Sequence, residues 1–243
     1  MPLLELRNVG RTFGGGGMFS QRPVVALDNF SLTIDDQKPL IVAIVGESGS
    51  GKTTMARLLL GLETPTSGHI LYKGTDLERL DRRTWAEYRR NVQAIFQDPF
   101  GVYNAFYKVD HVLTTPLRKF KLAKSRKEEQ RLIEDALRAV GLRPEDTLGR
   151  FPHQLSGGQR QRTMVARTLL LRPRVIVADE PVSMIDASLR ATVLGNLLQL
   201  KRDFGISLIY ITHDLTTAYQ ISDRIVVLYR GQVVEEGDPE QIV

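Results

Sequence analysis

The sequence predicts an α/β fold in which helices cover a mostly parallel sheet and a helical lobe is inserted into the chain. Three observations support this prediction. Short apolar runs alternate with helical patterns along most of the chain. A glycine-rich turn at residues 46–51 joins one apolar run to a helix, and strand-like runs disappear between residues 98 and 165. The 243 residues are enough for one domain with such an insertion.

The residues before the insertion are expected to form strands and one helix. Each predicted strand is a short run of clustered or alternating apolar residues, and the helix, residues 52–61, ends at a glycine. Glycines and polar residues between positions 14 and 23 predict a loop between the first two strands. The predicted strands are residues 3–9, 27–34, 39–45 and 68–72.

The insertion is expected to be helical, and the strand pattern returns after it. Within residues 127–140, apolar side chains recur at helical spacing and share one face, which consists of Leu132, Ile133, Ala136, Leu137 and Val140. After the insertion, the pattern predicts strands at residues 175–178, 206–211 and 224–229, with a helix at residues 189–204.

The composition is that of a globular protein and excludes several kinds of site. The absence of cysteine excludes disulfides, cysteine–metal sites and iron–sulfur clusters. No apolar run approaches the ~20 residues needed to cross a bilayer, and the amino terminus lacks the pattern of a secretion signal. Any role at a membrane is therefore expected to depend on docking to a partner.

The net charge of +5 has two interpretations. It could indicate a partner such as nucleic acid or an anionic membrane surface. It could also come from cations that bind phosphate and from a solvated basic stretch at residues 119–131, which contains Glu128 and Glu129 as an exposed helix face would. We favour the second interpretation and predict no nucleic-acid partner, because no basic motif with interleaved aromatic residues accompanies the charge.

Residues 46–53 fit the pattern of a phosphate-binding loop, G-x-x-x-x-G-K-[ST], between an apolar strand and a helix. Glycines let consecutive backbone amides turn toward phosphate oxygens, and the helix adds the positive end of its dipole. Lys52 is expected to reach the β- and γ-phosphates of ATP, and Thr53 to place its hydroxyl on Mg²⁺. The predicted phosphate-binding residues are Gly46, Ser48, Gly49, Ser50, Gly51, Lys52, Thr53 and Thr54.

An apolar strand at residues 175–178 ends in the carboxylates of Asp179 and Glu180. A strand end is rigid, so Asp179 can hold an Mg²⁺-bound water at a fixed position. Glu180 would then orient or deprotonate the water that attacks the γ-phosphate. The alternative is a solvent-facing acidic strand end, which the nearby phosphate loop disfavours.

Leu155-Ser156-Gly157-Gly158-Gln159 lies between the phosphate loop and the acidic strand, and it resembles the signature of ABC-type ATPases. In that family, the signature of one subunit closes over the γ-phosphate held by another, so the resemblance implies that Ser156, Gly157, Gly158 and Gln159 bind nucleotide across a dimer. Small residues at a helix start also expose amide donors without bulk.

Further residues match other motifs of this family. Gln97 corresponds to the Q-loop glutamine, which contacts Mg²⁺ or its water and senses the γ-phosphate. His213 corresponds to the switch histidine at the γ-phosphate, and Asp186 lies in the segment that crosses the dimer interface. Phe13 stands where the family stacks an aromatic ring on adenine, and core packing is its alternative role.

The resemblance implies a P-loop NTPase (RecA-like) core of mostly parallel sheet, with an antiparallel β subdomain and an inserted α-helical lobe. The whole chain, residues 1–243, would form a single ABC ATPase domain. Residues 1–97 and 166–243 would form the catalytic core with its β subdomain, and residues 98–165 the lobe that carries the signature.

Within the family, the chain is most similar to the ATPases of oligopeptide, dipeptide and nickel importers, at residues 44–52, 96–100, 151–162 and 229–231. This implies an ATP-hydrolysing subunit at the cytoplasmic face of the plasma (inner) membrane. Its partners would be a second ABC ATPase subunit, identical or related, transmembrane permease subunits and an extracytoplasmic solute-binding protein. The solute would be a peptide, with an oligosaccharide or a metal as alternatives.

Two other functions are weighed against the importer. A soluble ABC ATPase acting on nucleic acid or ribosomes usually has two cassettes, a coiled-coil insertion or a zinc module, and none of these is visible. A regulatory cassette that binds ATP without cleaving it is disfavoured by the presence of both Glu180 and His213.

Aromatic residues follow Gln97 closely in the chain. They could line a groove that holds a short helix of a permease, since exposed aromatic residues anchor interfaces. They could equally pack inside the helical lobe. The residues concerned are Phe100, Tyr103, Phe106 and Tyr107.

Overall fold

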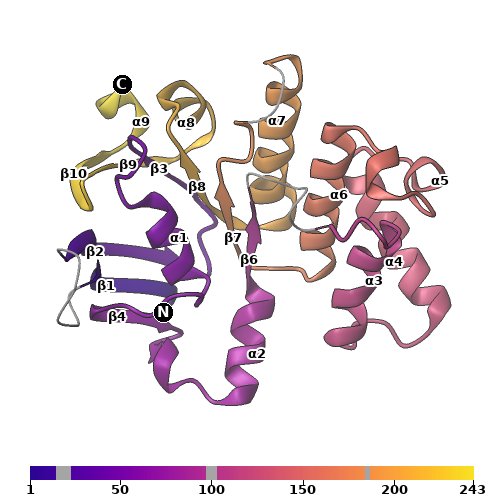
Figure 1. Cartoon of the computed structure of the whole chain (residues 1–243), viewed down its shortest axis with the longest axis horizontal. Helices are drawn as coiled ribbons and strands as arrows, with labels where there is room; N and C mark the ends of the chain where they lie inside the picture. Colours follow the sequence, from indigo (N-terminus) through magenta and orange to yellow (C-terminus); the bar gives the residue numbers. More distant parts are fainter. Residues whose placement is uncertain (15–22, 97–102, 184–186) are drawn as a thin grey trace.

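The computed structural model of the chain describes residues 1–14, 23–96, 103–183 and 187–243, and the side chains of residues 187–189 are not described. Two sheets and a helical lobe make up the fold (Figure 1). In the view of Figure 1, the antiparallel sheet lies toward the left end of the molecule and the helical lobe toward the right.

The central sheet has the strand order β10-β9-β3-β8-β7-β6. Its strands pair in parallel, except that β10 pairs antiparallel with β9 at one edge. β3 and β8 are buried along their whole length, as expected for parallel strands covered on both faces. The strands are β3 (Ile41–Val45), β6 (Val92–Ile95), β7 (Val175–Asp179), β8 (Ser207–Thr212), β9 (Arg224–Tyr229) and β10 (Gln232–Gly237).

An antiparallel sheet of order β2-β1-β4-β5 packs over one face of the central sheet. Phe30 of β2 and Leu4 of β1 share a core cluster with Val42, Val177 and Ile209 of the central sheet. The elements on this side are β1 (Pro2–Phe13), β2 (Val24–Asp35), β4 (Ser67–Tyr72), β5 (Thr75–Asp76), α1 (Lys52–Leu59), the 3₁₀ turn η1 (Leu77–Arg79) and α2 (Arg82–Asn91).

The helical lobe shares a second core cluster with the opposite face of the central sheet. Leu137 and Val165 of the lobe belong to the same cluster as Ile176 and Leu208 of the sheet. The lobe contains α3 (Asp110–Lys119), α4 (Arg126–Ala139), α5 (Pro144–Thr147), the 3₁₀ turn η3 (Pro152–Gln154) and α6 (Gly157–Leu170). The remaining helices are α7 (Ala187–Phe204), α8 (Leu215–Ile221) and α9 (Pro239–Ile242).

The predicted parallel sheet, antiparallel strands and inserted helices are confirmed. α1 stops at Leu59, and the chain leaves it through Gly61 in a left-handed conformation. Several elements outside the lobe were not predicted. Among them, β6 has only four residues, α2 is rich in arginine, and β10 is exposed for most of its length. The boundary proposed at residue 165 falls inside α6, and the division into core and lobe remains a prediction.

Within the described part of the chain, no helix combines the length and apolar character needed to span a membrane.

Candidate functional site

A pocket of about 820 Å³ lies where strands of the central sheet end, within the range typical of small-molecule sites. The phosphate loop forms one wall of this pocket, between β3 and α1. Glu180 and His213 come from the ends of β7 and β8. Carboxyl ends of parallel strands are where α/β sheets bind ligands. The lining residues are Val24, Val25, Ala26, Glu47, Ser48, Gly49, Gly51, Lys52, Thr53, Thr54, Glu180 and His213.

The phosphate loop passes close to neighbouring backbone, and glycines make that approach possible. A Cβ on Gly51 would lie 2.3 Å from the carbonyl oxygen of Ala26 in β2, and Gly51 has a φ of 106°. A Cβ on Gly46 would lie 2.3 Å from the carbonyl oxygen of Leu228 in β9. Both positions therefore require glycine for steric reasons, and Gly51 requires it for its backbone conformation as well.

Ser50 and Gly46 support the loop from behind rather than lining the pocket. The side chain of Ser50 is buried. The backbone carbonyl of Ser50 accepts a hydrogen bond of 2.9 Å from the amide of Gly231. Gly231 accepts a second bond of 2.8 Å from the amide of Asp28 in β2. The turn between β9 and β10 thus connects β2 to the phosphate loop. Gly231 was not predicted to contribute to the site.

Lys52 is buried beside the loop and faces two carboxylates. Its ammonium donates hydrogen bonds to the carbonyls of Gly46 (2.6 Å) and Glu47 (2.7 Å). Burial lowers the pKa of Lys52, and the nearby charges of Glu180 and Asp179 oppose that change. A phosphate entering the pocket would offer this buried cation a better partner than two carbonyl dipoles.

The carboxylates at the end of β7 differ in their surroundings. Burial, followed by the charge of Glu180, raises the pKa of Asp179, while Lys52 opposes the shift. A bound cation would remove this cost of burying a carboxylate, so Asp179 suits a site for a positive ion. Asp179 is not part of the lining of the pocket, whereas Thr53 supplies a hydroxyl from its wall. Carboxylate and hydroxyl oxygens are ligands that Mg²⁺ prefers.

Glu180 is held in an unusual backbone conformation. Its φ of 46° lies in the left-handed region, which is costly for a non-glycine residue. Backbone bonds hold it there, because its amide donates to the carbonyl of Ile211 at 2.9 Å and its carbonyl accepts from the hydroxyl of Ser183 at 3.0 Å. Strain of this kind is typical of functional positions.

His213 contacts Glu180 directly, with 3.0 Å between its Nδ1 and the Oε1 of Glu180. It lies between β8 and α8, where Asp214 caps the helix by accepting a bond of 2.9 Å from the amide of Thr216. The structure therefore brings together two of the predicted catalytic residues. Gln97 and Asp186 lie outside the described residues.

The signature residues lie outside the pocket, at the exposed start of α6. Ser156 and Gln159 form a capping box, in which the Ser156 hydroxyl accepts from the Gln159 amide and the Gln159 side chain accepts from the Ser156 amide. A Cβ on Gly157 would meet nothing within 4 Å. The start of α6 is therefore open to a group arriving from outside the chain.

Comparison with known proteins identifies the family. A family model described as ABC transporter matches residues 27–183. The chain belongs to the ABC transporter family. It is 42% identical to the dipeptide transport ATP-binding protein DppF of Escherichia coli (strain K12), over 93% of this chain and 67% of DppF. It is 40% identical to the oligopeptide transport ATP-binding protein OppF of the same organism, over 99% of this chain and 72% of OppF.

A solved structure of similar fold is the dimeric post-hydrolysis state of the ATP-binding cassette MJ0796 bound to ADP and Pi. Its TM-score is 0.83 at 29% identity, over 97% of this chain and 98% of that one. These matches confirm the predicted family, the cassette fold and the identification of the chain as an ATPase. They leave the roles of individual residues as predictions.

In this ABC cassette, Phe13 lies beside the pocket rather than in its lining. It pairs with Val24, which does line the pocket, and it is 37% exposed. Val24, Val25 and Ala26 were not predicted as site residues. They lie on β2. They reach the pocket only because β2 pairs with β1 and because Ala26 lies against Gly51 of the phosphate loop.

The aromatic residues after Gln97 have different surroundings. Tyr103 packs against the core of the lobe, and its hydroxyl donates a 3.0 Å bond to the carbonyl of Arg160 in α6. Phe106 is 89% exposed, and Tyr107 stacks on His111. Tyr103 therefore packs inside the lobe, as one interpretation expected. Phe106 is exposed, as the alternative interpretation of a docking residue requires. Phe100 lies outside the described residues.

The glycines of the loop give a stability test. Gly51→Ala should destabilise the nucleotide-free protein by more than Gly49→Ala, measured as the free energy of unfolding in urea. Both glycines have a positive φ, so each alanine costs roughly 1–2 kcal/mol for its conformation. Only Gly51 adds a clash with backbone, because a Cβ on Gly49 meets nothing within 4 Å. Equal losses of stability for the two variants would contradict the close contact between Gly51 and the backbone of Ala26.

Proposed function

We propose that this chain is the ATP-hydrolysing subunit of a peptide importer and that it works as one half of a dimer. The observation that carries the proposal is the division of the site. The phosphate loop, Glu180 and His213 share one pocket, whereas the signature opens outward at the start of α6. A single chain thus presents a nucleotide pocket and, elsewhere, a set of donors suited to phosphate.

The residues of the pocket have distinct roles in hydrolysis. Lys52 and the amides of the phosphate loop would bind the β- and γ-phosphates. Glu180 would accept a proton from the attacking water as the bond between the γ-phosphorus and the ADP oxygen breaks. His213, held 3.0 Å from Glu180, would orient that carboxylate and contact the γ-phosphate.

Mg²⁺ fits the donor set at the end of β7. Asp179 and the hydroxyl of Thr53 would hold it, and Gln97 is a further predicted ligand that lies outside the described residues. When bound, Mg²⁺ neutralises charge on the phosphate oxygens. The raised pKa of Asp179 supports this assignment, because partial burial and the charge of Glu180 both disfavour its ionised form and a cation would offset them.

A dimer would bring the two halves of the site together. Ser156, Gly157, Gly158 and Gln159 of one subunit would cover the γ-phosphate bound by the other, with Asp186 at the interface. MJ0796, whose fold is similar, is described as dimeric. The second subunit would be identical or related.

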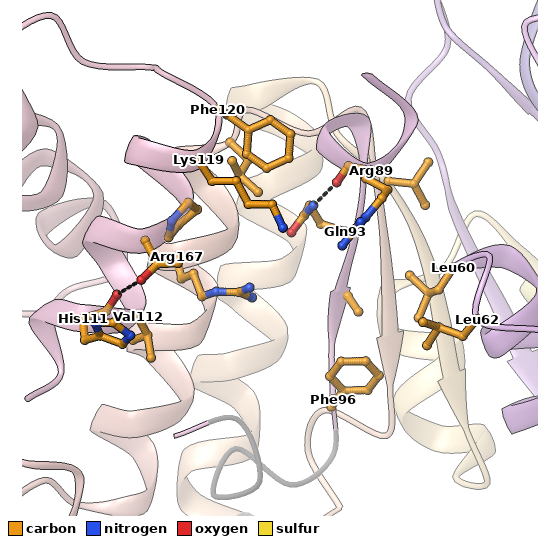
Figure 2. Close-up of a pocket in the computed structure, with 15 residues that line it drawn as sticks. Leu60, Leu62, Arg89, Gln93, Phe96, His111, Val112, Lys119, Phe120 and Arg167 are labelled. Atoms are coloured by element: carbon orange, nitrogen blue, oxygen red, sulfur yellow. Dashed lines mark hydrogen bonds between the residues drawn. The ribbon is translucent and has the colours of Figure 1, made fainter. Parts of the chain in front are cut away.

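A groove between the core and the lobe is suited to a permease. It has a volume of about 440 Å³ and lies between α2 and β6 on one side and α3 and α6 on the other. In Figure 2, Arg167 and Val112 face Leu60 and Leu62 across it. Phe96 at the end of β6 is 45% exposed in the groove. This partly exposed lining combines apolar side chains with the cations Arg89, Lys119 and Arg167, and it would hold a short segment of a transmembrane permease subunit.

The relatives support a peptide as the solute, because DppF is named for dipeptide transport and OppF for oligopeptide transport. By analogy with these proteins, the chain would lie peripherally at the cytoplasmic face of the membrane. An extracytoplasmic solute-binding protein would deliver the peptide to the permease. ATP-driven closing and opening of the dimer would supply the motion for transport.

Glu180→Gln tests the assigned base. The side-chain amide of glutamine cannot act as a base and accept a proton from water. ATP hydrolysis should therefore fall at least about a hundredfold while ATP still binds. Steady-state phosphate release and nucleotide affinity measure the two effects. Glu235→Gln, an equivalent change on exposed β10, is the control and should hydrolyse ATP at the normal rate. Near-normal hydrolysis by Glu180→Gln would overturn the assignment.

Phe96→Ser tests the groove against a matched exposed phenylalanine. Loss of a central aromatic anchor costs about 2 kcal/mol or more, so co-purification with the permease subunits should fall at least about tenfold. Phe204, 49% exposed at the end of α7 and absent from the lining of the groove, is the control. Both variants should bind ADP normally. The groove assignment fails if Phe96→Ser keeps the permease as well as Phe204→Ser does.

A further inference from the structure

Phe13 ends β1, and one face of its ring is covered by a cation. The guanidinium carbon of Arg11 lies 4.7 Å from the centroid of the ring. A guanidinium at this distance is attracted to the negative face of an aromatic ring. An aromatic ring has two faces, so this contact defines which face is left for a stacked base.

Arg11 is itself fixed by two hydrogen bonds. Its Nη2 donates to Oε2 of Glu63 at 2.7 Å, and its Nη1 donates to the carbonyl of Thr64 at 2.9 Å. The side chains of Arg11 and Glu63 are 22% and 25% exposed, so the ion pair is largely shielded from water. Two directed bonds from a planar group fix its orientation as well as its position.

The partners of Arg11 belong to the loop that follows α1, and α1 begins at the phosphate loop. The amide of Glu63 donates to the carbonyl of Arg57 in α1 at 3.3 Å, which holds the loop to the end of the helix. Thr66 in the same loop accepts a bond of 3.1 Å from the amide of Thr12. The end of β1 is therefore attached to one end of α1 while Lys52 lies at the other.

We propose that Arg11 is a positioning residue for nucleotide binding. It links the Phe13 ring to Glu63 and Thr64 and so sets the distance and orientation between the surface for the adenine base and the loop for the phosphates. This inference rests on the proposed function, in which adenine stacks on Phe13. Arg11 would act through Phe13 and would not touch the phosphates.

The test separates binding of the base from binding of the phosphates. Affinities for ADP and for inorganic pyrophosphate are measured by calorimetry on the full chain carrying Arg11→Ala, Arg11→Lys or Phe13→Ala. Arg11→Ala should weaken ADP binding by about 2- to 10-fold and leave pyrophosphate binding unchanged. Arg11→Lys keeps the charge but cannot make both directed bonds, to Glu63 and to Thr64, so it should restore only part of the affinity.

Coupling between Arg11 and Phe13 gives a second readout. Phe13→Ala should weaken ADP binding by about 5- to 100-fold, the usual range for loss of a stacked base. The double variant should bind ADP no more weakly than Phe13→Ala alone, because Arg11 acts through the ring. Arg7→Ala is the control, since Arg7 lies on β1 and pairs with Glu5 at an exposed position.

Each alternative outcome is distinguishable. If Phe13→Ala weakens ADP binding and Arg11→Ala does not, the role of Arg11 is overturned and the proposed function stands. If neither variant weakens it, adenine stacking on Phe13 is overturned as well. If Arg11→Ala weakens ADP and pyrophosphate equally, Arg11 is merely structural. Should Arg11→Ala not fold, Glu63→Gln removes the charged partner and must show the same selective loss of ADP affinity.

Discussion

The close approach of the phosphate loop to the backbone of β2 and of β9 is the constraint on which the rest of the site depends. Gly46 and Gly51 have no Cβ, so the loop can pass where Leu228 and Ala26 leave no room for one. The turn at Gly231 joins these supports through backbone bonds to Ser50 and Asp28. The amides that bind phosphate are thus placed by strands of both sheets and not by the loop alone.

That placement explains why charged groups can gather in the pocket before a nucleotide arrives. Lys52 lies among carbonyls and near two carboxylates, and the pKa values of Lys52 and Asp179 move in the directions that burial of a charge produces. The strained conformation of Glu180 is held by bonds to Ile211 and Ser183. The fold therefore tolerates buried charges and a strained backbone in order to hold the site ready. A bound nucleotide and cation would offset the unfavourable burial of charge.

The sequence was most informative where chemistry depends on neighbours in the chain. The phosphate loop and the acidic end of β7 are local patterns, and the structure brings them together with His213 as the order of parallel strands requires. Arg11 and Gly231 were missed because the hydrogen bonds that fix them join residues more than 50 positions apart. Similarly, Val24 lines the pocket only through sheet pairing, and β6 is too short to give a periodic signal.

The central claim is that the signature of one subunit completes the nucleotide site of another, and the direct test asks whether two copies of this chain pair in this way. Size-exclusion chromatography with light scattering on Glu180→Gln, without Mg²⁺, tests it most directly, because the bound ATP is not consumed. The account predicts a monomer with ADP and a dimer with ATP, and a monomer again when Gly157→Arg blocks the start of α6. A monomer under all conditions, with ATP bound, would contradict pairing between two copies of this chain and would leave only a related partner cassette.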